Sequence, residues 1–155
     1  MTNHTRHHWK LIPAIVMMTL IFIHSSMNGD ESTLESDTLI HILGIPLTDT
    51  VVIVVRKCAH IIEYIVLGAS IYFVTEDWYQ AKKDQNQNAA TRNANSLHKS
   101  LWQAWFVAFL YAVTDEIHQC FVPGRSGEIA DVIIDSIGCL IGVAIMYIVL
   151  RRRDA

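Results

Sequence analysis

Two charged runs stand inside an otherwise apolar chain. The stretch 115–131, DEIHQCFVPGRSGEIAD, places acids, a histidine and an arginine between two strongly apolar segments. The other run carries Arg56, Lys57, His60 and Glu63 within a third apolar segment. Histidine and carboxylate side chains can act as general acids or bases, and basic side chains can bind anions. These runs are the places where the sequence could do chemistry.

The sequence PGRSGE at 123–128 predicts a tight turn followed by a helix. Pro123 presets one turn position, and Gly124 and Gly127 permit positive φ. Such a turn aims backbone N–H groups outward beside the positive end of a helix, which suits an anion, and Arg125 could clamp a carboxylate or phosphate. The alternative is a tight turn whose arginine meets a lipid phosphate or Asp115.

Metal-ligand residue types also occur at helical spacing. The pairs are His60 with Glu63, Asp115 with His118, and Asp131 with Asp135. This inventory suits zinc or another divalent ion. However, Arg56 and Lys57 beside it would repel a cation, and the chain has neither HExxH nor a dense Cys/His cluster. We therefore predict no metal and no cofactor, and find no convincing nucleophile.

The elements that must position these residues are four apolar blocks. Hydrophobic residues make up 52% of the 155 residues, and the mean hydropathy is +0.29. A chain of this length is too short to bury four such blocks as a globular core, whereas each suits a membrane helix. We predict one all-α domain, 1–155, that is a polytopic bundle of four transmembrane helices at about 9–27, 51–75, 98–120 and 128–150. The first block could be a signal peptide, but no small-residue cleavage pattern follows it, which favours an anchor.

Lysine and arginine predict the orientation in the membrane. They precede the first block, occur between the second and third, and follow the fourth, whereas 25–50 has none and carries several acids. The positive-inside rule places both termini in the cytoplasm of a multi-pass cell-membrane protein. Both charged runs then fall near the outer surface. We also predict a polar loop at 25–50, whose 40–47 part lies on the membrane surface, and a mobile low-complexity loop at 81–96.

The aspartates of the last block predict how two helices pack. Asp131 and Asp135 share a helix face that Gly138 and Gly142 continue inward. An unpaired ion at the centre of a membrane helix costs about 2.5–3.5 kcal/mol. We therefore predict that the second and fourth helices pack side by side, with Arg56 or Lys57 close to these aspartates. An ion-pair network that only fixes helix register and a functional site are both open explanations.

The three cysteines do not form a disulfide framework. Cys58 and Cys120 both fall near the predicted outer surface, so a bridge between them is geometrically possible. The favoured interpretation is that Cys58, Cys120 and Cys139 are small hydrophobic fillers.

The two charged runs resemble the VanZ-like family of small bacterial membrane proteins, named for one linked to teicoplanin resistance. The resemblance rests on RKCAHIIEYIVLG at 56–68 and TDEIHQCFVPGRSGEIADVIIDSIGCLIG at 114–142. The family's motif positions correspond to Lys57, His60, Glu63, Tyr64, Glu116, His118, Gln119, Pro123, Gly124, Arg125, Gly127 and Asp131. The chain departs from the family at Asp135, where Asn is more common, which implies an additional negative charge and a different preferred ligand.

The resemblance implies work in the cell envelope without implying a mechanism. We favour binding or shielding of an anionic envelope molecule, such as a lipid-linked wall precursor or an anionic lipid, over an intramembrane acid/base or metal-dependent enzyme. Membrane lipid is an expected partner and nucleic acid is not, while the oligomeric state is left open. The candidate site comprises Lys57, His60, Glu63, Tyr64, Asp115, Glu116, His118, Gln119, Arg125, Asp131 and Asp135, with Gly124 and Gly127 in the turn.

Overall fold

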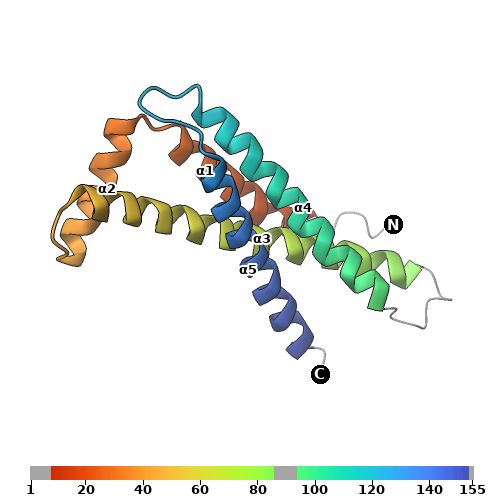
Figure 1. Cartoon of the computed structure of the whole chain (residues 1–155). Helices are drawn as coiled ribbons and strands as arrows, with labels where there is room; N and C mark the ends of the chain where they lie inside the picture. The colour runs from red at the N-terminus through yellow and green to blue at the C-terminus, as the bar shows by residue number, and fades with distance from the viewer. Residues whose placement is uncertain (1–7, 86–93, 154–155) are drawn as a thin grey trace.

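The structure is a computed structural model that describes residues 8–85 and 94–153, and within these ranges it is entirely helical. A short 3-10 helix, His8–Leu11, leads into five α-helices (Figure 1). These are α1 (Ile12–Ser26), α2 (Gly29–Leu43), α3 (Asp49–Gln85), α4 (Ala94–Gln119) and α5 (Ile129–Arg153). The prediction of an all-α chain is therefore confirmed over the described residues.

Within residues 8–85 and 94–153, two helical stretches are long and apolar enough to cross a membrane. They are Trp9–Ser26 and Ile129–Arg152, which coincide with the first and last predicted spans. The second predicted helix, 51–75, is part of the much longer α3, and the third, 98–120, is most of α4. The assignment of these two helices as membrane spans stays a prediction.

The predicted loop at 25–50 is wrong for residues 29–43, which form α2. Asn28 caps this helix: its side chain accepts the Glu31 N–H at 2.9 Å, and the Glu31 carboxylate accepts the Asn28 N–H at 3.2 Å. Gly44, with φ of 67°, ends it in the left-handed conformation that glycine adopts without strain. The acids Asp30 and Glu31 stand in the first turn, where negative charge stabilises a helix.

The predicted loop at 81–96 is also shorter than expected. Residues 81–85 continue α3 and residues 94–96 begin α4. The segment 86–93 between them lies outside the described residues, so its predicted mobility is untested.

Three glycines set the crossing of α3 and α5, which is the most extensive helix contact in the fold. A Cβ on Gly142 would collide with the backbone of Ile65, and one on Gly68 would collide with the backbone of Cys139. A Cβ on Gly138 would stand 3.0 Å from the Ile61 carbonyl oxygen. The predictions that Gly138 and Gly142 serve helix packing, and that these two helices lie side by side, are both confirmed (Figure 1).

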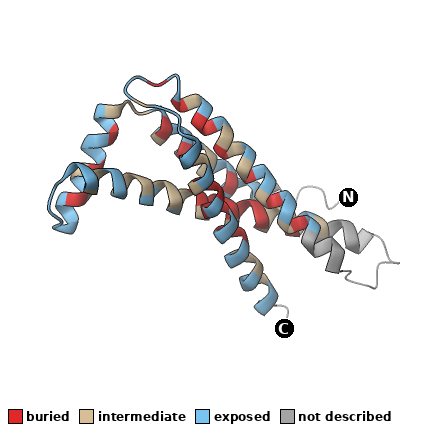
Figure 2. Ribbon diagram, viewed as in Figure 1, coloured by how far each residue is buried: buried red, intermediate tan, exposed pale blue. Residues whose placement is uncertain are grey.

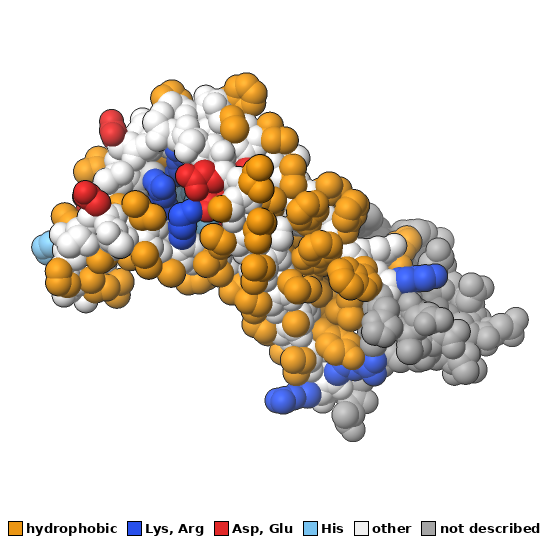
Figure 3. All heavy atoms as spheres, viewed as in Figure 1, with side chains coloured by type: hydrophobic (Ala, Val, Ile, Leu, Met, Phe, Trp, Pro, Cys, Tyr) orange, Lys and Arg blue, Asp and Glu red, His pale blue; other side chains and the backbone are white. Residues whose placement is uncertain are grey.

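The core lies where α1, α3, α4 and α5 meet. Small side chains at Ala104, Ala108 and Ala112, four residues apart, let α4 approach the buried aromatic rings of Tyr64 and Tyr72. Buried positions follow the facing sides of the helices, whereas many large apolar side chains are exposed on their outer faces (Figures 2 and 3). An apolar outer surface around a partly polar interior is typical of a protein that contacts lipid.

Candidate functional site

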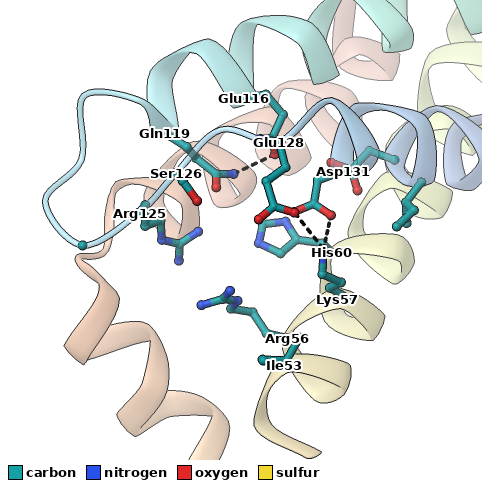
Figure 4. A pocket seen from close by; sticks show the side chains of 13 residues that line it. Ile53, Arg56, Lys57, His60, Glu116, Gln119, Arg125, Ser126, Glu128 and Asp131 are labelled. Atoms are coloured by element: carbon teal, nitrogen blue, oxygen red, sulfur yellow. Dashed lines mark hydrogen bonds and ion pairs between the residues drawn. The ribbon is translucent and has the colours of Figure 1, made fainter. Parts of the chain in front are cut away.

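A polar cavity of about 170 Å³ lies among α3, the end of α4, the loop 120–128 and the start of α5 (Figure 4). Both charged runs of the sequence contribute to it. Its lining residues are Ile53, Arg56, Lys57, His60, Glu116, Gln119, Gly124, Arg125, Ser126, Glu128, Asp131, Ile134 and Asp135.

Lys57 binds the acidic wall of the cavity. Its ammonium group forms an ion pair with Asp131, and it lies 3.7 Å from a carboxylate oxygen of Glu128 (Figure 4). The predicted proximity of a basic residue on the second helix to an aspartate on the last is therefore confirmed. The charge of Lys57 is compensated within the protein.

The carboxylate of Glu116, a residue of α4, lies at the N-terminal end of α5. One of its carboxylate oxygens accepts the backbone N–H of Glu128 at 2.9 Å, and the other accepts an N–H of Gln119 at 3.2 Å. The N–H of Arg125 in the preceding turn bonds to the Val122 carbonyl oxygen at 3.1 Å. The prediction that the turn offers its N–H groups to an outside anion is wrong for these two, because the protein's own acceptors use them.

The two glycines of the turn have different roles. Gly124 adopts φ of 75°, as its predicted turn role permits. Gly127 has no positive φ; a Cβ there would lie 2.5 Å from the Glu116 carbonyl oxygen and 2.6 Å from the Cys120 sulfur. Gly127 therefore allows the loop to pack closely against the end of α4.

Arg56 and Arg125 form the basic side of the cavity (Figure 4). Arg125 Nη2 donates to the His24 carbonyl oxygen at 3.0 Å, while its Nε is buried without a hydrogen-bond partner. Across the described residues, no hydrogen bond or ion pair engages Arg56. Burial, followed by the positive charge of Arg56, lowers the pKa of the Arg125 guanidinium. The alternative prediction of an ion pair between Arg125 and Asp115 is wrong in the described structure, and both guanidiniums lack a carboxylate partner.

Tyr64 and Asp115 lie behind the cavity and do not line it. Tyr64 is fully buried, and its hydroxyl donates to Asp115 Oδ2 at 3.1 Å. Gln119, which does line the cavity, donates to the same oxygen at 3.4 Å. This network links α3 to α4, so these two predicted site residues support the cavity from outside it.

Glu63 and His118 face α1 instead of the cavity. Glu63 forms an ion pair with Nδ1 of His24, a residue that the sequence analysis did not single out. The His118 ring stacks on Phe22, with 4.7 Å between ring centroids, and its Nε2 lies 3.0 Å from the Ser26 hydroxyl. Both predicted site residues thus tie the end of α1 to the rest of the bundle.

Several residues that line the cavity were not among the predicted site residues, above all Arg56 and Glu128. A signal for Arg56 existed: Ile53, Arg56, Lys57 and His60 have the i, i+3, i+4, i+7 spacing of one helix face. Seven of the predicted site residues do line the cavity: Lys57, His60, Glu116, Gln119, Arg125, Asp131 and Asp135.

The cysteines and the metal-ligand types give no further site in the described part of the chain. Within it, no group of three or more His, Cys, Asp or Glu side chains is arranged to hold a metal ion. All three cysteines are free, so Cys58 and Cys120 are not bridged. Cys139 is buried, as a filler should be, whereas Cys58 and Cys120 are exposed, so for them the filler interpretation stays a prediction.

Comparison with known proteins identifies the family. No curated protein and no solved structure matches the chain. The family model described as VanZ/LLP1 matches residues 10–150, which is nearly the whole chain and includes every residue of the cavity. Together with the two apolar helices, this match indicates a membrane protein. The chain belongs to the VanZ/LLP1 family.

Proposed function

We propose that this protein crosses the cell membrane four times, with both termini in the cytoplasm, and that its cavity binds an anionic group of an envelope molecule at the outer surface. The charge distribution supports this orientation. Arg151 and Arg152 lie in the last turn of α5, whereas the cavity lies at the beginning of the same helix. Figure 3 shows basic side chains at one end of the molecule and a mixed charged cluster at the other.

The observation that carries the proposal is the pair of guanidiniums in one cavity. Lys57 is compensated by Asp131 and Glu128, but Arg56 and Arg125 have no carboxylate partner in the described structure. Two uncompensated cations that face the same partly buried space repel each other, and an anion between them removes that cost. Guanidinium groups bind phosphate and carboxylate through paired hydrogen bonds.

An anion site at the outer surface fits the envelope role that the VanZ-like resemblance implies. The ligand is a lipid phosphate or a lipid-linked wall precursor that enters from the surrounding membrane lipid. By occupying the anionic part of such a molecule, the protein shields it, which is a route to weaker action of a glycopeptide such as teicoplanin.

The test is lipid binding to the detergent-purified protein by native mass spectrometry. Dioleoyl phosphatidate should remain bound, whereas dioleoylglycerol, which has the same tails and no phosphate, should not. Because hydrogen bonds to charged groups are worth about 1.5–3 kcal/mol, Arg56→Gln and Arg125→Gln should each weaken phosphatidate binding about tenfold or more. Arg152→Gln, which removes an exposed cation at the far end of α5, is the matched control. Equal retention of both lipids, or no loss in either cavity variant, would contradict the proposal.

A second candidate function is acid/base catalysis on such a molecule. His60 and Asp135 both line the cavity. His60 Nδ1 lies 3.8 Å from a carboxylate oxygen of Glu63, and Asp135 makes no hydrogen bond to any described group. Two such groups in one cavity can give and take protons during a reaction. Turnover of a phosphate-bearing lipid by the purified protein, abolished by His60→Ala, would favour the enzyme. Near-stoichiometric zinc that is lost in His60→Ala would favour it as well.

A further inference from the structure

Some charged side chains of the cavity have a hydrogen-bond or ion-pair partner within the protein, and others have none among the residues that the structure describes. Lys57 and Asp131 form an ion pair, and Glu116 accepts hydrogen bonds from Glu128 and Gln119. Glu128 in turn lies 3.7 Å from Lys57. Four further ionisable side chains line the cavity outside these pairings: Arg56 and His60 on α3, Arg125 in the loop and Asp135 on α5.

Asp135 is the buried member of this set. It is 2% exposed, yet it lines the cavity, and no described group donates a hydrogen bond to it. Three donors on the same and adjacent helices bond to other groups. The Ser136 hydroxyl donates to the Val132 carbonyl oxygen, the Trp105 indole donates to the Ser136 carbonyl oxygen, and the Tyr64 hydroxyl donates to Asp115.

A buried carboxyl group is costly unless it has a hydrogen-bond partner. No described donor bonds to Asp135, including the unused donors of Arg56 and His60 in the same cavity, so a molecule bound there can supply its partner. Asp135 is therefore placed to accept from a hydrogen-bond donor on a bound molecule.

The position of Asp135 sets where that donor lies. Asp135 follows Asp131 by four residues, which is about 6 Å further along α5 from its outer end, by the helical rise. Arg125 is in the loop before α5, so the anion-binding side of the cavity is nearer that outer end. A ligand that satisfies both must carry its anionic group outside and its donor deeper in the bundle.

The volume of the cavity limits the size of the ligand. At about 170 Å³ it is smaller than the roughly 300–1,000 Å³ of pockets that hold drug-sized molecules. It suits a phosphate with a substituent of a few atoms, and it is too small for the whole sugar-peptide part of a wall precursor.

From these observations we propose that the cavity selects a lipid phosphate with a small head group that bears a hydroxyl or ammonium donor. Arg56 and Arg125 hold the phosphate and Asp135 accepts from the donor. This inference rests on the proposed anion-binding function and adds to it the chemistry of the head group.

The experiment compares lipids that share tails and phosphodiester charge and differ only in the donor. Phosphatidylglycerol is paired with phosphatidylmethanol, which lacks the hydroxyls, and phosphatidylethanolamine is paired with phosphatidylcholine, whose quaternary ammonium has no N–H. Dissociation constants are measured for detergent-purified full-length protein. Because a hydrogen bond to a charged group is worth about one order of magnitude in affinity, at least one donor-bearing lipid should bind about tenfold more tightly than its partner.

The variants of Asp135 identify the donor. Asp135→Ala should bring the ratio of the two dissociation constants close to one. Asp135→Asn keeps an acceptor of the same shape, so it should preserve most of a preference for the hydroxyl and lose most of a preference for the ammonium. If Asp135→Ala does not fold, Asp135→Leu, which also removes the acceptor but fills a similar volume, takes its place. Glycerol 3-phosphate as a competitor reports whether a free head group binds without the lipid tails.

The failures of the two proposals are distinguishable. Equal affinity for both members of each pair, with Arg56→Gln and Arg125→Gln still weakening binding, would overturn the head-group inference and leave the anion site intact. A preference that persists in both Asp135 variants would overturn the role of Asp135. If none of the four lipids binds, the anion site and the head-group inference both fall.

Discussion

Lys57 shows at the scale of one residue why charge is tolerated here. Its side chain is 33% exposed and that of Asp131 is 27% exposed, so the ion pair is neither fully in water nor fully buried. Neighbouring Glu128 is more exposed and lies 3.7 Å away. Each charge in the pair offsets the desolvation of the other, so the energetic importance of Lys57 depends on whether its partner is present.

The first prediction concerns this dependence. Lys57→Met should lower the free energy of unfolding, because it leaves Asp131 without a cation, by less than the roughly 3–5 kcal/mol seen for fully buried pairs. Lys57→Met combined with Asp131→Asn should be more stable than Lys57→Met alone. Thermal unfolding in detergent and folded yield by size-exclusion chromatography measure both. A double variant as unstable as the sum of the single variants would mean that the two residues act independently.

At the scale of elements, the crossing of α3 and α5 determines where the cavity walls stand. The glycines at 68, 138 and 142 allow the two backbones to approach, and this approach brings Lys57 within reach of Asp131. Any change that separates the helices should therefore disturb both stability and the cavity.

The second prediction tests this crossing with Gly142→Ala. The added Cβ would collide with the backbone of Ile65, and no rotamer change can relieve this collision. The free energy of unfolding should therefore fall by about 1–3 kcal/mol or more. Ala144→Val adds more volume two residues away at an exposed position and should change stability by less than about 0.5 kcal/mol. Scanning fluorimetry in detergent compares the two variants. Equal melting temperatures for both would show that the crossing tolerates a wider separation.

The third prediction concerns the cap of α2. Asn28→Ala removes the side chain that accepts the Glu31 N–H, which should destabilise α2 by about 1 kcal/mol. A difference of this size is about a fivefold increase in the open population, and proteolysis within 29–43 should accelerate by the same factor. Thr38→Ala, which loses only a hydroxyl bond to the Leu34 carbonyl oxygen at an exposed position, is the control. Identical cleavage rates in the two variants would contradict a role for the cap.

At the scale of the whole molecule, separated charge sets the orientation that we propose. Cys120 is exposed at the end of α4, next to the cavity loop, and it reports on the side of the membrane that the cavity faces.

The fourth prediction is that Cys120 reacts from outside the cell. In a background with Cys58→Ser and Cys139→Ala, an impermeant thiol reagent should label Cys120 in intact cells, because the positive-inside rule places this end outside. Replacement of Cys120 by Ser in the same background is the control for non-specific labelling. Labelling that occurs only after lysis would reverse the orientation and place the cavity in the cytoplasm.

The sequence by itself determined the helical content, the pairing of the two charged runs and the close packing at Gly138 and Gly142. These follow from local rules: apolar blocks of sufficient length form helices, and an ion within such a block requires a partner of opposite charge. The sequence also carries a signal for helix α2, because Asn28 followed three residues later by Glu31 is a capping pattern. The acids around it favoured a loop instead.

Only the tertiary structure decided which charged residues face the cavity. Steps of three residues fall about 60° short of a full helical turn, so Lys57 and Glu63 point about 120° apart on α3. Lys57 consequently meets α5, whereas Glu63 meets His24 on α1. His118 turns to Phe22 and Ser26 for the same kind of reason. Spacing fixes the angles between side chains on one helix, but the neighbour that each side chain meets depends on where the other helices pack.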